Sequence, residues 1–96
     1  MSTKVHPTAI VESGAELGED VEVGPYAYIG PRVQLGDRTV VWHHATVEGL
    51  TVMGVENRIF PYAYIGAQTH DLKFMGGMPG LKIGNRNTLR EYVTVH

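Results

Sequence analysis

The chain has 96 residues, a formal net charge of −2 and no cysteine, so it holds one domain at most and carries no disulfide, thiolate metal site or cysteine nucleophile. The weak negative charge gives no basis for binding nucleic acid or an anionic membrane surface. The first ten residues lack the apolar core of a signal peptide, and no apolar run is long enough to span a bilayer, so we expect a soluble, cytoplasmic protein without stable membrane insertion.

From Val5 onward the chain repeats with a period of six residues. Every sixth position is aliphatic: Val5, Val11, Leu17, Val23, Ile29, Leu35, Val41, Val47, Met53, Ile59 and Ile65. A helix with 3.6 residues per turn cannot keep every sixth residue on one face, whereas short strands joined by turns can. Four alanines follow at intervals of eighteen: Ala9, Ala27, Ala45 and Ala63. We therefore predict an all-β hexapeptide-repeat coil with the aliphatic and alanine columns inside.

Glycine recurs at intervals of eighteen, once the twelve-residue interruption is subtracted, and marks a corner of the predicted coil. It follows the aliphatic residue of every third hexad, at Gly18, Gly36, Gly54 and Gly84. Such a column indicates either that a Cβ atom does not fit or that φ must be positive. Three sides per eighteen residues make a triangular prism, in which successive coils stack about 4.8 Å apart.

Two columns of larger side chains point outward in this arrangement. One contains Thr8, Tyr26, His44, Tyr62 and Tyr92, and the other contains Ile10, Tyr28, Thr46, Tyr64 and Thr94. Aromatic columns on one side of a prism are unusual for a surface that faces water. We expect this side to pack against another copy of the chain.

Residues 71–82, with the sequence DLKFMGGMPGLK, interrupt the repeat by two hexads, and the frame resumes at Ile83. Three glycines and a proline predict a loop, and its apolar side chains favour a loop that covers a neighbour or a ligand. Nothing that resembles a terminal cap follows His96. We therefore interpret residues 1–96 as the N-terminal part of a β-helix domain, with about five coils and an inserted loop at 71–82.

Four stretches carry a resemblance to a known family: HPTAIV at 6–11, GPYAYIGP at 24–31, HDLKF at 70–74 and IGNRNTLREYVTVH at 83–96. The chain resembles the left-handed parallel β-helix acyltransferases, and within them the acyl carrier protein-dependent UDP-N-acetylglucosamine O-acyltransferases of lipid A biosynthesis. The resemblance implies a left-handed coil and a homotrimer with active sites in the clefts between subunits. It also implies transfer of a 3-hydroxyacyl group from acyl carrier protein to the sugar 3-hydroxyl, without a metal or soluble cofactor.

The same resemblance places substrate contacts at Asp71 and Lys73 and puts His96 in the lining of the cleft. His70, another candidate contact, stands where the family commonly has glutamine. The chemistry is compatible, because a carboxylate accepts hydrogen bonds from sugar hydroxyls and an ammonium group meets a phosphate or polarises a carbonyl. Judged by charge alone, the two loop residues also fit a solvated pair. In the family the general-base histidine lies beyond His96, so we expect no catalytic residue here and no activity from this chain alone.

Two other functions stay open: a related hexapeptide acyl- or acetyltransferase acting on another sugar nucleotide, and a non-catalytic β-helix scaffold. A zinc site of the γ-type carbonic anhydrase kind is a further alternative, since His44, His70 and His96 are each 26 residues apart. When the twelve-residue loop is subtracted, His44 and His96 are 52 − 12 = 40 residues apart, which is two coils plus four residues. They do not share a column, and we expect no metal site.

Overall fold

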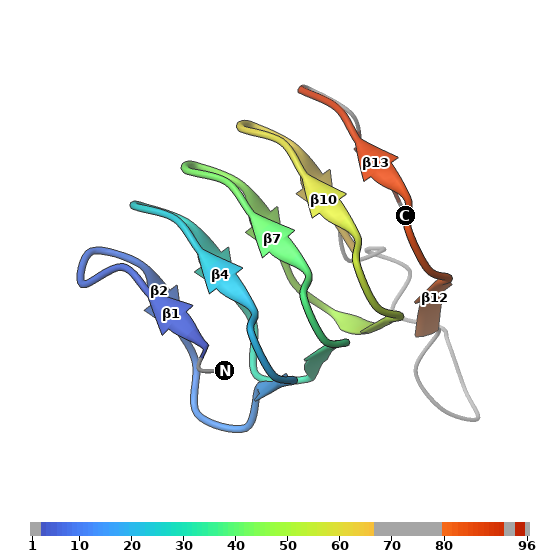
Figure 1. Ribbon diagram of the computed structural model, residues 1–96, viewed down its shortest axis with the longest axis horizontal. Helices are drawn as coiled ribbons and strands as arrows, with labels where there is room; N and C mark the ends of the chain where they lie inside the picture. Colours follow the sequence, from blue (N-terminus) through green and yellow to red (C-terminus); the bar gives the residue numbers. More distant parts are fainter. Residues whose placement is uncertain (1–2, 67–79, 92–93, 96) are drawn as a thin grey trace, which may run out of the picture.

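The computed structural model describes residues 3–66, 80–91 and 94–95, in which short strands stack into three parallel sheets (Figure 1). Sheet A contains β1 (Lys4–Val5), β4 (Glu22–Val23), β7 (Val40–Val41), β10 (Arg58–Ile59) and β13 (Thr88–Leu89). Sheet B contains β2 (Ile10–Val11), β5 (Tyr28–Ile29), β8 (Thr46–Val47), β11 (Tyr64–Ile65) and β14 (Thr94–Val95). Sheet C contains β3 (Glu16–Leu17), β6 (Val33–Leu35), β9 (Leu50–Met53) and β12 (Gly80–Ile83). The described residues thus form four complete coils and two strands of a fifth.

The strand register follows the eighteen-residue repeat. Val5 pairs with Val23, and Val23 pairs with Val41. After the interruption the offset becomes thirty, so that Ile59 pairs with Leu89. The added twelve residues therefore leave every later coil in frame, as the sequence predicts.

The interior of the prism is filled by the predicted columns. Thirteen hydrophobic side chains are buried in the described residues, including Ile29, Ile59 and Ile65, and the alanines at 27, 45 and 63 are almost fully covered. Burial weakens toward the first coil, where Val5 is 42% exposed because no coil covers it in this chain. Since apolar burial contributes about 25 cal/mol per Å², most of this stabilisation comes from coils two to four.

Three polar side chains of the described residues are also fully buried, and hydrogen bonds satisfy each of them. Thr39 donates to the carbonyl of Gly54, and Thr51 donates to the carbonyl of Glu48. Asn57 donates to the carbonyls of Gly54 and Gly84 and accepts from the amide of Asn87. No buried side-chain nitrogen or oxygen in the described part of the chain lacks a partner. Asn57 thereby ties the fourth coil to the turn that starts the fifth.

The glycine column marks a corner because there is no room for a side chain. A Cβ atom on Gly36 would lie 2.9 Å from the amide nitrogen of Val55, and one on Gly18 would lie 2.9 Å from that of Asp37. None of the four glycines has a positive φ, so the second reason suggested by the sequence is wrong for this column. The backbones of successive coils approach too closely for Cβ at the first three positions, whereas Gly84 has open space.

At these corners, positive φ angles occur instead at residues other than glycine. At the corner between sheets C and A they fall on Asp20, Arg38, Glu56 and Arg86, with φ from 57° to 59°. At the corner between sheets A and B they fall on Tyr26, His44 and Tyr62, with φ from 60° to 65°. Such angles are uncommon outside glycine and asparagine.

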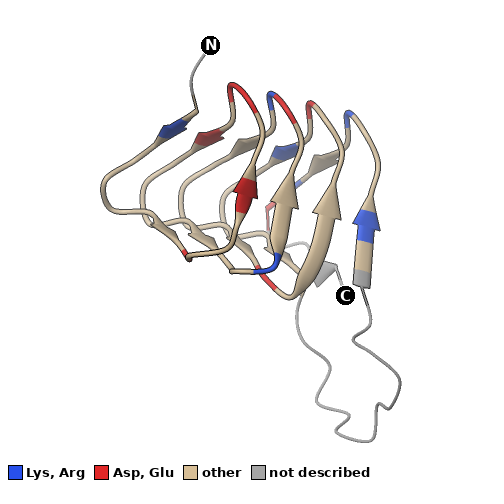
Figure 2. Ribbon diagram, turned by 90° about the horizontal axis from the view of Figure 1, so that it is seen from below, with Lys and Arg blue, Asp and Glu red and all other residues tan. Residues whose placement is uncertain are grey.

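The corner between sheets C and A carries alternating charges along the stack, as Figure 2 shows. The carboxylate of Glu56 lies between two guanidinium groups: its Oε2 is 3.3 Å from Nε of Arg38, and its Oε1 is 3.7 Å from Nη1 of Arg86. All three side chains are at least 41% exposed, so each pair contributes little to stability.

The inserted segment leaves sheet B and returns to sheet C in the fourth coil. Glu48 bonds to Ile65 next to Gly66, and Leu50 already pairs with Gly80, so the extra residues enter between Gly66 and Gly80. Residues 80–82, which the sequence assigns to the end of the loop, pair as a strand with Leu50–Val52. Residues 71–79 of the predicted loop lie outside the described residues.

Candidate functional site

The four predicted contact residues, His70, Asp71, Lys73 and His96, lie outside the described part of the chain. The structure therefore gives the surroundings from which the site is built. These are the outward face of sheet B, the corner where the inserted segment begins and the corner between sheets A and B.

The segment begins at Gly66, which directly follows β11. Gly66 is buried and has φ of 79°, and a Cβ atom there would collide with the carbonyl oxygen of Glu48 and the hydroxyl of Thr51. The Thr51 hydroxyl donates a 2.8 Å hydrogen bond to the same carbonyl. The chain thus enters the insertion from a rigid corner that tolerates only glycine.

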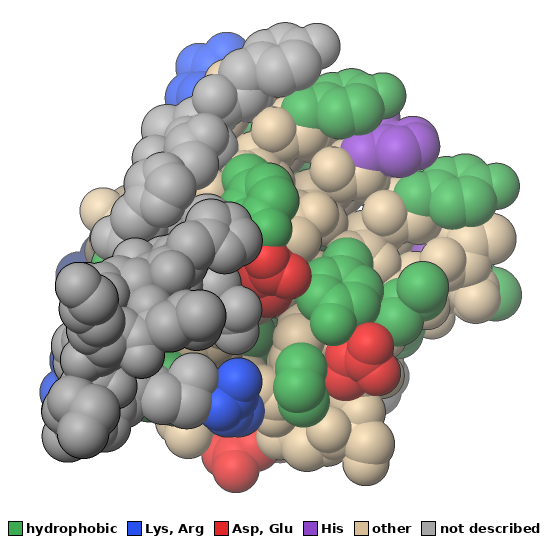
Figure 3. Space-filling view, turned by 180° about the vertical axis from the view of Figure 1, so that it is seen from behind, with side chains coloured by type: hydrophobic (Ala, Val, Ile, Leu, Met, Phe, Trp, Pro, Cys, Tyr) green, Lys and Arg blue, Asp and Glu red, His purple; other side chains and the backbone are tan. Residues whose placement is uncertain are grey.

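Two phenol–carboxylate pairs lie on the outward face of sheet B. The hydroxyl of Tyr28 donates to Oε2 of Glu12 over 3.2 Å, and the hydroxyl of Tyr64 donates to Oε2 of Glu48. In each pair the glutamate precedes the tyrosine by sixteen residues, so the bond joins one coil to the next. Figure 3 shows this side of the molecule, where acidic side chains lie among hydrophobic ones.

These pairs favour the protonated form of both phenols. The hydrogen bond to Glu48, followed by burial, raises the pKa of Tyr64 above its ordinary value of 10.0. Burial, followed by the bond to Glu12, raises the pKa of Tyr28. A protonated phenol donates and a carboxylate accepts, so the face presents polar groups of the kind that bind hydroxylated ligands.

A stack of three rings runs along the corner between sheets A and B. The ring of His44 lies 5.2 Å from that of Tyr26 and 5.2 Å from that of Tyr62, with interplanar angles of 26° and 13°. Tyr26 and Tyr62 are 63% and 48% exposed. His43 meets this stack edge-on, and its Nδ1 lies 2.9 Å from Nδ1 of His44. The predicted outward aromatic column is thus present at Tyr26, His44 and Tyr62.

The described residues include no group of three or more histidine, cysteine, aspartate or glutamate side chains that would hold a metal ion. Two of the three equally spaced histidines, His70 and His96, lie outside that search. The His43–His44 pair supplies two nitrogen ligands, which is fewer than the three or four protein ligands of a zinc site.

Sequence reasoning placed the tyrosines of sheet B in a column but missed their glutamate partners. The signal was available, because Glu12 and Glu48 each precede a tyrosine of that column by sixteen residues. It also missed that two consecutive histidines pair through their rings. Neither feature follows from a six-residue period, since both depend on side-chain rotamers.

Comparison with known proteins shows that this chain is similar to transferases. The family described as "Bacterial transferase hexapeptide (six repeats)" matches residues 14–49. A curated relative, the acyl-[acyl-carrier-protein]–UDP-N-acetylglucosamine O-acyltransferase of Thermodesulfovibrio yellowstonii, is 44% identical over 93 residues, which is 97% of this chain and 36% of the relative.

Solved structures agree. The UDP-N-acetylglucosamine O-acyltransferase of Moraxella catarrhalis superimposes with a TM-score of 0.87 and 38% identity, over 96% of this chain and 36% of that one. The related structure from Acinetobacter baumannii gives 0.85 and 41%, over 94% and 35%. By sequence and fold, the chain is a relative of the UDP-N-acetylglucosamine O-acyltransferases.

These likenesses confirm the resemblance read from the sequence and, together with the three parallel sheets, the left-handed parallel β-helix that it implies. The chain spans about a third of the length of the acyltransferases it matches. In the residues that the structure describes, no helix is long and apolar enough to cross a membrane.

Proposed function

We propose that the chain forms the first coils of an enzyme that transfers a 3-hydroxyacyl group from acyl carrier protein to the 3-hydroxyl of UDP-N-acetylglucosamine, the first step of lipid A biosynthesis. The observation that carries this proposal is the 44% identity over 93 residues with an acyltransferase of that name. The tightly packed corner at Gly66 and the Tyr64–Glu48 pair beside it support a site built around the inserted segment. Such an enzyme works in the cytoplasm.

In this proposal the contact residues act by charge and hydrogen bonding. Asp71 and His70 bind sugar hydroxyls, Lys73 meets a phosphate or the thioester carbonyl, and His96 lines the cleft. A base removes the proton from the sugar 3-hydroxyl, whose oxygen attacks the thioester carbonyl, and the same proton then goes to the leaving thiol. The base is a histidine outside these 96 residues, and no metal or soluble cofactor takes part.

The proposed enzyme is a homotrimer, with each cleft formed between two copies. The exposed stack at the corner between sheets A and B supports such contacts, because Tyr26 and Tyr62 leave much of their rings in water. In the trimer these rings contact a neighbouring copy. Sedimentation of the chain against its Tyr26→Glu variant tests this, since a charge in the contact lowers association; equal masses for both would contradict it.

A chimera tests the function directly. The part of the Thermodesulfovibrio yellowstonii relative that aligns with this chain is replaced by residues 1–96, and acyl transfer is followed by mass spectrometry. We expect activity, and we expect Lys73→Ala to lower kcat/KM about ten- to 150-fold, as for the loss of a charged hydrogen bond.

The matched control is Lys82→Ala, which removes the same charge from an exposed position on β12. A folded, trimeric chimera without transfer, or equal activity in the two lysine variants, contradicts the proposal. Transfer to a different sugar nucleotide would favour the related acyltransferase instead. Residues 1–96 alone should show no turnover, and measured turnover would refute the placement of the base.

A further inference from the structure

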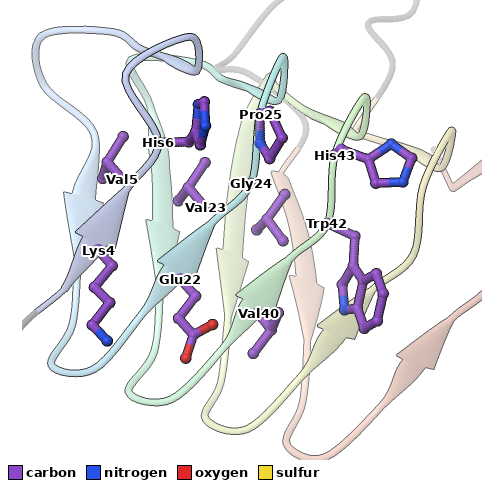
Figure 4. A pocket seen from close by; sticks show the side chains of 11 residues that line it. Lys4, Val5, His6, Glu22, Val23, Gly24, Pro25, Val40, Trp42 and His43 are labelled. Atoms are coloured by element: carbon purple, nitrogen blue, oxygen red, sulfur yellow. The ribbon is translucent and has the colours of Figure 1, made fainter.

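The corner between sheets A and B carries two consecutive histidines in the third coil, His43 and His44. In the first, second and fourth coils the position that corresponds to His43 is a proline, at Pro7, Pro25 and Pro61. Figure 4 shows Pro25 and His43 at the same turn of successive coils. The sequence of the third coil therefore places two imidazole rings, each with nitrogen atoms that can bind a metal ion, at one corner.

The backbone of this turn brings the two side chains together. Successive side chains of an extended strand point to opposite faces, but His44 has φ of 60° and so leaves the strand conformation. The amide of His44 donates a hydrogen bond to the carbonyl of Pro25 over 3.1 Å, which ties the turn to the preceding coil. In this turn the Nδ1 atoms of His43 and His44 lie 2.9 Å apart.

Neighbouring aromatic rings orient both imidazoles. The ring of His44 is stacked between those of Tyr26 and Tyr62. The ring of His43 meets that of Tyr62 edge-on, with centroids 6.2 Å apart and an angle of 88°. His43 is half-buried and His44 is exposed, so the pair is accessible from solvent. Because the rings are already held, binding an ion costs less conformational entropy than it would for two free side chains.

The distance between the two nitrogen atoms favours one coordination geometry. Two nitrogen ligands at about 2.0 Å from a metal ion lie about 2.8 Å apart when they subtend a right angle, and about 3.3 Å apart at the tetrahedral angle. The observed separation of 2.9 Å is closer to the right angle. Right angles between neighbouring nitrogen ligands are typical of square-planar and tetragonal Cu(II) and Ni(II) sites, whereas Zn(II) prefers the tetrahedron.

A metal ion would replace the proton that the two rings share. In the hydrogen bond between His43 and His44 one Nδ1 donates and the other accepts. A metal ion needs the lone pair of both atoms. The proton therefore moves from Nδ1 to Nε2 of the same ring, so that both imidazoles stay neutral and no net proton is released.

We propose that His43 and His44 bind one Cu(II) ion through their two Nδ1 atoms, with water in the remaining positions. Imidazole is a suitable ligand for copper, and among the divalent ions of the first transition row Cu(II) binds such a site most tightly. Ni(II) binds at the same place with lower affinity. The proposal does not depend on acyl transfer, because the proposed reaction uses no metal and binding to this chain alone decides it.

Electron paramagnetic resonance of the tag-free chain with one equivalent of copper sulfate tests the ligands directly. We expect a tetragonal Cu(II) spectrum with hyperfine coupling to two imidazole nitrogens, and calorimetric titration should give one ion per chain. His43→Ala should lower the affinity at least about tenfold, since even the loss of an outer-shell partner costs about 10–100-fold. His44→Asn should do the same, and asparagine tolerates the left-handed conformation of that position.

The matched control removes every other histidine of the chain: His6, His70 and His96. This triple alanine variant keeps only the proposed ligands and should bind Cu(II) with the affinity and the spectrum of the parent. Circular dichroism verifies that each variant is folded. The proposal would be overturned by absence of saturable binding, by a spectrum without coupling to two nitrogens, by unchanged affinity in His43→Ala or His44→Asn, or by loss of binding in the folded triple variant.

Discussion

Replacing Asn57 by alanine tests how the coil after the insertion is held in register. The Asn57 side chain is fully buried and makes three hydrogen bonds, of 2.8 Å to the Gly84 carbonyl, 3.1 Å to the Gly54 carbonyl and 2.8 Å from the Asn87 amide. The Gly54 carbonyl keeps a second donor, the hydroxyl of Thr39 at 3.2 Å. The variant therefore leaves two backbone groups without their partner.

A buried polar group that loses its partner costs about 1–3 kcal/mol. Gly84 and Asn87 lie in an exposed turn, so water replaces part of the loss, and we expect Asn57→Ala to lower the free energy of unfolding by about 2–3 kcal/mol. For a domain of this size each kcal/mol shifts Tm by about 4–8 °C. Urea denaturation and thermal melting followed by circular dichroism measure both quantities.

Asn85 supplies the control, because its side-chain oxygen accepts a 2.9 Å hydrogen bond from the amide of Val55 at an exposed position. Asn85→Ala should cost about 0.5–1 kcal/mol. Asn57→Asp has nearly the volume of asparagine but no amide donor, so it separates hydrogen bonding from cavity formation and should destabilise at least as much as Asn57→Ala. Equal stability of the alanine variants, or an Asn57→Asp variant as stable as the parent, would refute the reasoning.

Three further predictions concern the site and the corners. Because the pKa of Tyr64 is raised above 10.0, the Tyr64–Glu48 hydrogen bond stabilises the fold below about pH 10, and this stabilisation is lost as the pH rises through the raised pKa. Glu48→Gln should therefore lower the pKa of Tyr64, as measured by NMR titration. Gly66→Ala should lower Tm strongly because φ is 79° and Cβ collides, whereas Gly84→Ala, whose Cβ has open space, should not; equal melting would contradict this. Glu56→Gln should change stability by less than about 1 kcal/mol, with the difference shrinking in high salt; a larger, salt-independent loss would show that the exposed charges matter more.

The coil and its core were predictable because they follow from a period. Six is an even number, so the aliphatic at every sixth position faces the same way in each strand, and Val23, Val41 and Ile59 are buried as expected. The period also revealed the insertion. Its predicted end, Lys82, lies three residues too far along the chain, because residues 80–82 already pair as a strand of sheet C. An apolar segment next to a repeat does not itself show where pairing resumes.

The site was less predictable, since it depends on contacts between coils that a period does not specify. The family resemblance named Asp71 and Lys73, and both remain predictions. The pairing of Tyr64 with Glu48 depends on how side chains cross from one coil to the next, and the pairing of His43 with His44 depends on the rotamers of two consecutive residues. The glycine at position 24 depends in turn on a close approach of backbones, since a Cβ atom there would lie 2.9 Å from the amide nitrogen of His43.

The corners show why a glycine column and a positive φ are separate features. The backbone amides of left-handed corner residues donate hydrogen bonds to the preceding coil. Arg38 donates to the Glu19 carbonyl over 2.9 Å, Glu56 to that of Asp37 over 2.8 Å, and Arg86 to that of Val55 over 2.9 Å.

The aromatic corner follows the same rule. His44 donates to the Pro25 carbonyl over 3.1 Å, and Tyr26 donates to the Thr8 hydroxyl over 3.1 Å. A residue in the left-handed conformation costs about 1–3 kcal/mol. Here its amide continues the hydrogen bonding between coils through the turn, and its side chain points outward at the corner. The left-handed conformation therefore directs the rings of Tyr26, His44 and Tyr62 outward into the exposed stack. Glycine would adopt the same backbone angles more easily, but it has no side chain to contribute to this stack.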